Sequence, residues 1–383
     1  MQQISRRHFL RCTSTLLATP IVMPLVQEPV FGSLPAATPE YWIRLALQCI
    51  ARTSMTPPRA ARLLALIGIG MLRLVEQRRD AAALAGLAGT LLHALVPLAT
   101  TLGLPIPPER PIAMAAARAF AHGERIAMRI LEWAAADGAT TTPPFEAPPV
   151  DRLPEGEWAP TPHTFASGIE PKWGELRPLL LPHGAALRVA RPPAWHSDQF
   201  DRIRAEFVNV QQFRDTEAAI ARGWAYGSGT ITPVGYWFER AMLLVEAQQL
   251  GVPASLRVYS TLGIALHDAC IACWESKYHY RLARPIQWML GSSPGWAPLL
   301  TTPPHPSYPS GHATISGAAA MILGSFFPDS AEVLAQQAAE AAASRVTGGI
   351  HWSIDGHAGL LQGRRVAEHL LVRRVAAHRG GAR

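Results

Sequence analysis

Three short segments carry side chains that together could hold a tetrahedral oxyanion and act on it. Arg presents a planar fork to anion oxygens, Lys offers a compact positive charge, and His exchanges protons near neutral pH. The segments therefore predict an oxyanion site with acid–base or nucleophilic chemistry. In chain order their polar residues are Lys277 and Arg284, then Ser310-Gly311-His312, then Arg345 and His351.

The middle segment stands where a Pro- and Ser-rich loop enters a predicted helix. The first N–H groups of a helix point at an incoming anion, and the helix dipole favours negative charge there. The Ser310 hydroxyl could donate to an anion oxygen, Gly311 would let the backbone approach closely, and His312 could exchange a proton with a ligand or leaving group. Alone, the segment could equally be a Ser-Gly turn with a capping histidine.

The flanking segments supply the cations and a second histidine. We predict Lys277 and Arg284 two turns apart on one face of one helix, although a solvated basic face has the same spacing. His351 could serve as a nucleophile toward phosphorus or as a ligand of vanadium. Asp355, four residues later, could orient a ring N–H of His351 or cap a helix.

The four cysteines, Cys12, Cys49, Cys270 and Cys273, are too few for a disulfide scaffold. Cys270 and Cys273 share a predicted helix face with Lys277, and no second pair accompanies them as a zinc site would require. We interpret them as small buried side chains that pack beside the site.

Apolar residues at three- and four-residue spacing predict an all-α fold with almost no strand. We expect two packed helical halves, residues 33–140 and 197–383, joined by a Pro-rich connector at 141–196. The helix ending before Pro285 is expected to include Arg284. The predicted helices are 41–53, 58–77, 81–102, 111–135, 198–223, 236–250, 253–284, 312–327, 331–347 and 354–378.

Residues 1–32 have the pattern of a twin-arginine export signal. Arg6-Arg7 precedes a modest apolar run from Leu16 to Val26, which predicts export by the twin-arginine machinery to the periplasm or the outside. Residues 81–108 contain no charged side chain, but Pro97 and several polar residues favour a buried helix over a stable membrane span. The net charge of +7 is not gathered in runs of Lys and Arg interleaved with aromatic residues, so we expect no nucleic-acid partner.

In order, K-x6-RP, PSGH and SR-x5-H resemble the pattern shared by type 2 phosphatidic acid phosphatases, bacterial class A acid phosphatases and vanadium-dependent haloperoxidases. The resemblance covers roughly 200–365. It implies a helical bundle of the vanadium haloperoxidase and acid phosphatase type that holds phosphate or vanadate. It makes His312 the acid–base residue and His351 the ligand or nucleophile. It implies anion contacts from Lys277, Arg284, Ser310, Gly311 and Arg345.

Several details look more like the haloperoxidase branch and its exported bacterial relatives. These are Trp274 three residues before Lys277, Tyr308-Pro-Ser-Gly-His-Ala-Thr, His351-Trp-x-x-Asp355, and Gly-x-Gly-Thr-x-Thr-Pro-x-Gly at 227–235. His305 stands where chloride-oxidising members carry Phe and algal bromide-oxidising members carry His, which favours bromide or iodide. Leu282-Ala283 depart from the aromatic residues of the fungal chloroperoxidases, so this pocket wall is expected to differ.

The resemblance implies a vanadate-dependent haloperoxidase that uses hydrogen peroxide, a halide and a small organic acceptor, in which Lys277 polarises bound peroxide. Two other functions remain open. An exported acid phosphatase would cleave a phosphomonoester through a phosphohistidine at His351. An oxyanion-binding protein would use the same cations without turnover.

Overall fold

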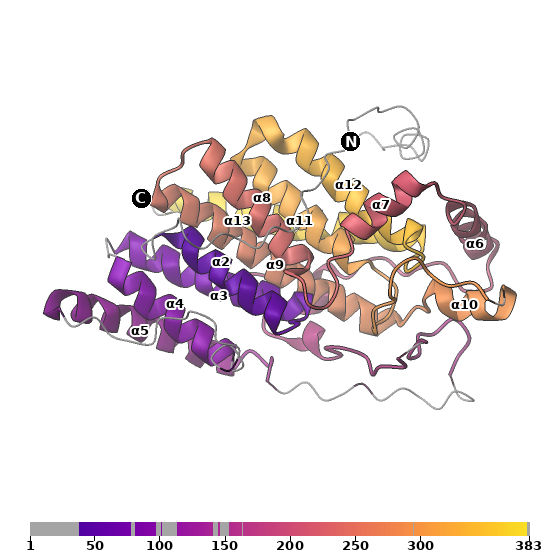
Figure 1. Cartoon of the computed structure of the whole chain (residues 1–383), viewed down its shortest axis with the longest axis horizontal. Helices are drawn as coiled ribbons and strands as arrows, with labels where there is room; N and C mark the ends of the chain where they lie inside the picture. The colour runs from indigo at the N-terminus through magenta and orange to yellow at the C-terminus, as the bar shows by residue number, and fades with distance from the viewer. Residues whose placement is uncertain are drawn as a thin grey trace. The chain divides into compact units, whose positions relative to one another are not determined.

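The computed structural model describes residues 38–77, 81–96, 101, 113–140, 145, 153–162, 164–293 and 295–380 (Figure 1). They belong to one compact unit, Leu34–Arg383. The described residues form helices and one isolated antiparallel bridge between Glu157 and Leu282. The predicted all-α class is therefore confirmed. The predicted export signal, residues 1–32, lies outside the described residues.

The N-terminal helices are α2 (Pro39–Arg52), α3 (Pro57–Glu76), α4 (Ala81–Leu95) and α5 (Met114–Ala135). In Figure 1 these indigo and purple helices lie together along one side of the bundle. Thr38 caps α2 by accepting the Tyr41 N–H at 3.4 Å, and prolines open α2 and α3, where a missing N–H does no harm. The expected helix 81–102 ends at Leu95.

Helix α9 (Val252–Tyr280) joins the two halves of the molecule. It packs against α3 on the N-terminal side and against α11 (Gly311–Phe326) on the C-terminal side. Most of its side chains are buried, as expected for a helix covered on several faces. The N-terminal and C-terminal helices therefore pack on one another through α9, while the bounds of the two halves stay a prediction.

The C-terminal half surrounds α11. Helices α12 (Ala331–Thr347) and α13 (Ser353–Gly380) pack directly on it. Helices α11 and α13 approach most closely where α13 carries glycine, because a Cβ at Gly363 would lie only 2.0 Å from the Thr314 carbonyl oxygen. The remaining elements are α6 (Asp198–Val210), α7 (Asp215–Gly223), α8 (Thr232–Ala247), α10 (Pro285–Ser292), η3 (Trp173–Glu175), η4 (Gly184–Leu187) and η5 (Pro328–Ser330).

One predicted helix, 198–223, is two helices in the structure. Helix α6 ends at Val210 and α7 starts at Asp215. The Arg214 N–H donates to Glu217 Oε2 at 2.8 Å, which begins a new helix with its own capping bond. The apolar periodicity continued across this break and hid it.

The prediction that Lys277 and Arg284 share one helix face is wrong. Helix α9 ends at Tyr280 because Arg281 adopts a left-handed conformation (φ +48°). The chain after it bonds to the connector, with Ala283 N–H donating to the Gly156 carbonyl at 2.8 Å. Arg284 is instead the N-cap residue of α10, a helix that the sequence analysis did not predict.

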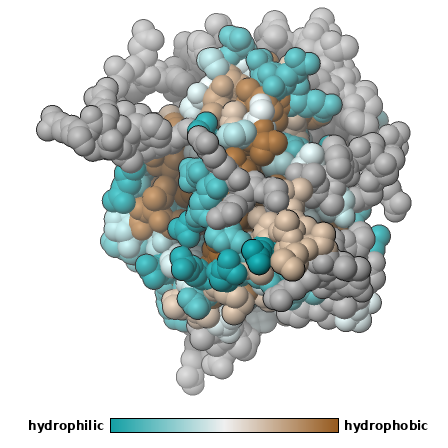
Figure 2. Space-filling view, turned by 90° about the vertical axis from the view of Figure 1, so that its left-hand side faces the viewer, coloured by the Kyte–Doolittle hydropathy of each residue, from teal (hydrophilic) through white to brown (hydrophobic). Residues whose placement is uncertain are grey.

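None of the helices in the described part of the chain combines the length and apolar character needed to cross a bilayer. On the face drawn in Figure 2, hydrophobic patches are interrupted by hydrophilic side chains.

The connector is attached to α9 by one buried carboxylate. Asp268 accepts the N–H groups of Leu179, Leu180 and Leu181 at 2.8, 2.8 and 2.9 Å. The carboxylate is 2% exposed, so these bonds replace its hydration. Asp268 therefore holds the connector against the helix that carries Lys277.

We expect Asp268→Ala to lower the free energy of unfolding by on the order of 3 kcal/mol, because three N–H groups lose an ionised acceptor. Asp268→Asn keeps one carbonyl oxygen and should lose less. Urea unfolding of the full chain measures both, and an unchanged midpoint for the alanine variant would contradict this role.

Candidate active site

The predicted site residues come together at the N-terminal end of α11. Ser310 is the N-cap of this helix, and its hydroxyl accepts the Ala313 N–H at 3.4 Å. The Ser310 N–H donates to the Asp355 carbonyl at 2.9 Å, which joins the start of α11 to the first turn of α13. The helix N-terminus thus lies where the predicted anion would bind.

Lys277, in the last turn of α9, points into the loop that precedes Ser310. Its Nζ donates to the carbonyls of Pro306 at 2.8 Å and Ser307 at 3.0 Å, and the side chain is fully buried. Burial lowers the pKa of Lys277 to about 7, and the charge of Arg284 acts in the same direction. The ammonium is therefore held in place by backbone oxygens rather than by an acidic partner.

Arg284 contacts two of the three histidines of the site, His305 and His351. Its Nη1 donates to the Ile350 carbonyl at 2.5 Å and lies 3.0 Å from His351 Nε2. Its Nε donates to the His305 carbonyl and its Nη2 to His305 Nδ1, both at 2.9 Å. All of these contacts are buried, so the guanidinium has a single fixed orientation.

The two ring nitrogens of His351 have different partners. Nδ1 lies 2.7 Å from Asp355 Oδ2, whereas Nε2 faces Arg284. Because the carboxylate is an acceptor and the guanidinium a donor, Nδ1 carries the proton and Nε2 presents a lone pair. Burial, and after it the charge of Arg284, holds the pKa of His351 well below its usual range. The ring is thus neutral and ready to act as ligand or nucleophile at Nε2.

Asp355 fills both roles that its position suggested. The oxygen that faces His351 also accepts the Trp352 N–H at 3.0 Å at the start of α13, as a helix cap does. It also accepts the Ser307 hydroxyl at 2.5 Å, a contact that the sequence analysis missed. Burial raises the pKa of Asp355 to about 6.

The end of α7 positions His312 and Arg345 through backbone carbonyls. His312 Nε2 lies 3.1 Å from the Trp224 carbonyl and 3.2 Å from that of Ala225. Arg345 Nη2 donates to the Ala221 carbonyl at 2.8 Å. Nε2 of His312 is therefore the protonated nitrogen, which leaves Nδ1 to accept a proton. No side-chain pattern in residues 221–225 could have revealed this role.

His312 is also the neutral histidine that acid–base chemistry requires. Burial, followed by the charge of Arg345, holds its pKa well below the usual range. Among the predicted site residues it alone is partly exposed, since the others are buried. His312 therefore stands between the buried site and solvent.

Trp274 and His305 form one wall of the site. Their ring centroids are 5.3 Å apart, and Lys277 Nζ lies 6.0 Å from the Trp274 ring. A Cβ at Gly311 would lie 3.5 Å from the same indole, so the α11 N-terminus packs against this wall. The Trp274 Nε1–H donates to the Ile169 carbonyl at 3.3 Å, which anchors the ring to the connector.

The site has an excess of buried positive charge. Lys277, Arg284 and Arg345 are each at most 1% exposed, and within the described residues none forms an ion pair. Burial lowers the pKa of Arg284 to about 10 and that of Arg345 to about 9, so both stay charged near neutral pH. One carboxylate, Asp355, faces them. An anion would supply the missing negative charge.

This donor set fits vanadate or phosphate better than a metal cation. Guanidinium, ammonium, hydroxyl and helix N–H groups all donate to oxyanion oxygens. His351 Nε2 offers one nitrogen ligand. Within the described ranges, no cluster of three or more His, Cys, Asp or Glu side chains could hold a metal ion.

Cys270 and Cys273 are free, fully buried thiols. Burial raises the pKa of both, so they remain protonated. Cys273 Sγ lies 3.9 Å from the Pro309 carbonyl, which supports packing beside the site.

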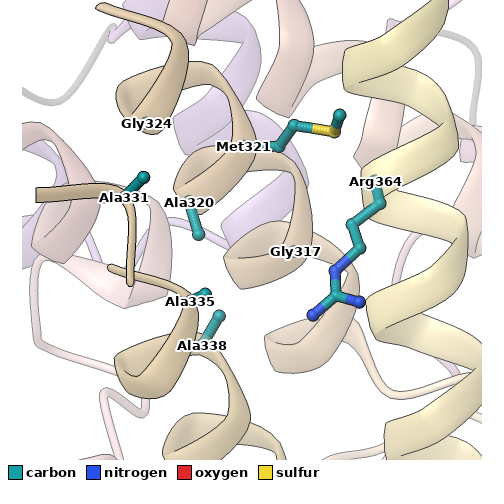
Figure 3. Close-up of a pocket in the computed structure, with 8 residues that line it drawn as sticks. All are labelled: Gly317, Ala320, Met321, Gly324, Ala331, Ala335, Ala338 and Arg364. Atoms are coloured by element: carbon teal, nitrogen blue, oxygen red, sulfur yellow. The ribbon is translucent and has the colours of Figure 1, made fainter. Parts of the chain in front are cut away.

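A separate cavity of about 280 Å³ lies between α11, α12 and α13 (Figure 3). It is lined by Gly317, Ala320, Met321, Gly324, Ala331, Ala335, Ala338 and Arg364. None of the predicted site residues lines it.

The fold is similar to that of solved vanadium-dependent haloperoxidases. A solved structure described as the first bacterial vanadium-dependent iodoperoxidase is 25% identical, with a TM-score of 0.75 over 87% of this chain and 95% of its own. Apo and holo structures of a bacterial vanadium-dependent chloroperoxidase are 14% identical with TM-scores of 0.62. They cover 85% and 90% of this chain and 95% and 93% of their own, and show likeness of fold alone. No curated protein matches the chain.

The PAP2 superfamily model matches residues 257–377, the region that contains every predicted site residue from Trp274 to Asp355. This region is similar to the PAP2 superfamily, and the chain has the all-helical fold of the vanadium-dependent haloperoxidases.

Proposed function

We propose that the protein is a vanadate-dependent peroxidase that oxidises a halide with hydrogen peroxide. The observation that carries the proposal is His351, whose Nε2 lone pair faces a buried, cation-rich site while Asp355 holds its other nitrogen. The likeness to a bacterial vanadium-dependent iodoperoxidase, at 25% identity over most of both chains, supports this choice of chemistry.

Bound vanadate would supply Lewis acidity that activates peroxide toward a halide. The residues that would hold it are His351, through Nε2, and the donors Lys277, Arg284, Arg345, Ser310 and the N–H of Gly311. Because these donors are fixed by backbone carbonyls and helix packing, they need little reorganisation when negative charge develops nearby.

His312 accepts a proton from the substrate, and Lys277 stabilises the negative charge that develops on it. Neutral His312 takes a proton from hydrogen peroxide at Nδ1 while the carbonyls of Trp224 and Ala225 hold its Nε2–H. Lys277 donates a hydrogen bond to a peroxide oxygen as that oxygen gains negative charge.

The halide would meet the wall formed by Trp274 and His305. His305 Nδ1 lies 2.9 Å from Arg284 Nη2 and 3.2 Å from the Pro306 carbonyl. Because a guanidinium can only donate and its contact is the shorter one, we take Nδ1 as the acceptor, so the other nitrogen carries the proton and can donate to an anion. This donor suits a halide anion. The choice of bromide or iodide rests on the resemblance at His305, and a small organic molecule is the proposed acceptor. We also propose that the twin-arginine machinery exports the protein to the periplasm or the outside.

An acid phosphatase is the second candidate. The contact between His351 Nδ1 and Asp355 would equally orient a histidine for attack on the phosphorus of a phosphomonoester, with His312 protonating the leaving alcohol. The third candidate, an oxyanion-binding protein, would use the same buried cations without turnover.

Sulfate binding should weaken as pH rises through about 7, because Lys277 then loses its positive charge. Sulfate is the suitable probe, since its own charge does not change near neutral pH. Calorimetric titration at several pH values measures the effect. Lys277→Met should bind more weakly below about pH 7 and lack this pH step. An identical step in that variant would assign it to another group.

Bromination of a phenolic dye should require peroxide, bromide and added orthovanadate in one purified sample. If vanadate instead only inhibits hydrolysis of p-nitrophenyl phosphate, the phosphatase is the correct function. Phosphate binding without either activity would identify an oxyanion-binding protein.

Replacing the two histidines should separate binding from turnover. His351→Ala should abolish activity, since the ligand or nucleophile is gone. His312→Ala should lower turnover by about 10²- to 10⁴-fold while it largely spares anion affinity. Steady-state rates and phosphate titrations test both variants, and an active His351→Ala protein would exclude both enzymatic mechanisms.

A further inference from the structure

Ser307 contacts three parts of the site. Its hydroxyl donates to Asp355 Oδ2 at 2.5 Å, and its carbonyl accepts from Lys277 Nζ at 3.0 Å. Its N–H donates to the Leu282 carbonyl at 2.9 Å, two residues before Arg284. The residue is fully buried. One loop residue thus connects α9, the segment leading to α10, and α13.

The hydroxyl acts on the Asp355 carboxylate rather than directly on His351. Ser307 Oγ lies 3.4 Å from His351 Nδ1, too far for a strong bond, and Nδ1 already has Asp355 at 2.7 Å. Asp355 Oδ2 accepts from Ser307, His351 and the Trp352 N–H together. Asp355 Oδ1 is buried and accepts no hydrogen bond within the described residues. The donors on Oδ2 therefore determine how the carboxylate is oriented.

The orientation of Asp355 determines which nitrogen of His351 carries the proton and which presents a lone pair to the site. While the carboxylate holds Nδ1–H, the lone pair of Nε2 is directed at Arg284 and the predicted anion. If Asp355 turned, the ring would lose the contact that selects this tautomer. Partners one layer behind a ligand typically change affinity or activity 10- to 100-fold.

We propose that Ser307 is a positioning residue of the oxyanion site, whose hydroxyl fixes Asp355 against His351 while its carbonyl holds the Lys277 ammonium. The proposal rests on the proposed function only in taking His351 Nε2 as the atom that meets the anion. It applies equally to vanadate and phosphate.

The test compares the full-length wild-type chain with Ser307→Ala. Inorganic phosphate, titrated calorimetrically, should bind about 10- to 100-fold more weakly to the variant. In ¹⁵N spectra of histidine-labelled protein, the His351 ring, assigned by its loss in His351→Ala, should change from one tautomer toward a mixture. Ser307→Thr restores a hydroxyl and should recover most of the affinity.

The matched control is Ser316→Ala. Ser316, one turn after His312 on α11, is also fully buried, and its hydroxyl accepts the Trp237 Nε1–H at 3.0 Å rather than a bond from a predicted site residue. This variant should lose comparable thermal stability while phosphate affinity and the His351 spectrum stay unchanged. If Ser307→Ala behaves in the same way, Ser307 is merely structural and the proposal fails.

Two further measurements keep the proposal testable. If Ser307→Ala does not fold, Ser307→Cys retains the side-chain size but donates a much weaker hydrogen bond, so phosphate should again bind more weakly. In an Asp355→Asn background, Ser307→Ala should add little, because the hydroxyl acts through Asp355. If Ser307→Ala weakened phosphate binding in this background as much as in wild type, the hydroxyl would not act through Asp355.

These readouts need no turnover, so the two proposals fail separately. A wild-type protein without peroxidase activity, together with weakened phosphate binding in Ser307→Ala, would reject the proposed function and retain the role of Ser307. Peroxidase activity of the wild type, with unchanged phosphate binding and an unchanged His351 tautomer in Ser307→Ala, would retain the proposed function and reject the role of Ser307.

Discussion

Burial of three cations around one carboxylate is the constraint on which the site depends. Charges removed from water cost several kcal/mol each unless fixed partners replace the lost hydration. Here the partners are largely backbone carbonyls, as at Pro306 and Ser307 for Lys277 and at Ile350 for Arg284. Carbonyls are free for such contacts in loops and in the last turn of a helix, as at Ala221 in α7. The irregular loops at the start of α11 therefore follow from the charge that they solvate.

Rigid helices behind these loops keep the carbonyls in position. Helix α9 is packed between α3 and α11, and α13 approaches α11 so closely that glycine is needed at Gly363. The connector is held to α9 by Asp268 and to Trp274 by the Ile169 carbonyl. Such support lets hydrogen-bond donors face a developing negative charge without reorganising, which is the main source of electrostatic catalysis.

Helical periodicity predicted most of the fold but not its breaks. Residues 198–223 and 253–284 kept an apolar repeat through points where the helices end, because periodicity reports burial on one face and not the backbone angles. The end of α9 depends on the left-handed Arg281 and on pairing with residues 156–158 of the connector. The pairing is a contact with a distant segment, which a local pattern does not contain.

Residue types and spacing alone predicted which side chains would form an oxyanion site and in what order, since oxyanion chemistry requires particular residue types such as Lys277, Arg345 and His351. Tertiary structure alone decided that Nε2 of His351 faces the site, that Arg284 caps α10, and that Ser307 supports Asp355. Carbonyls that orient His312 come from Trp224 and Ala225, far along the chain. The reason is physical: every residue has a carbonyl, so only the fold shows which ones are used.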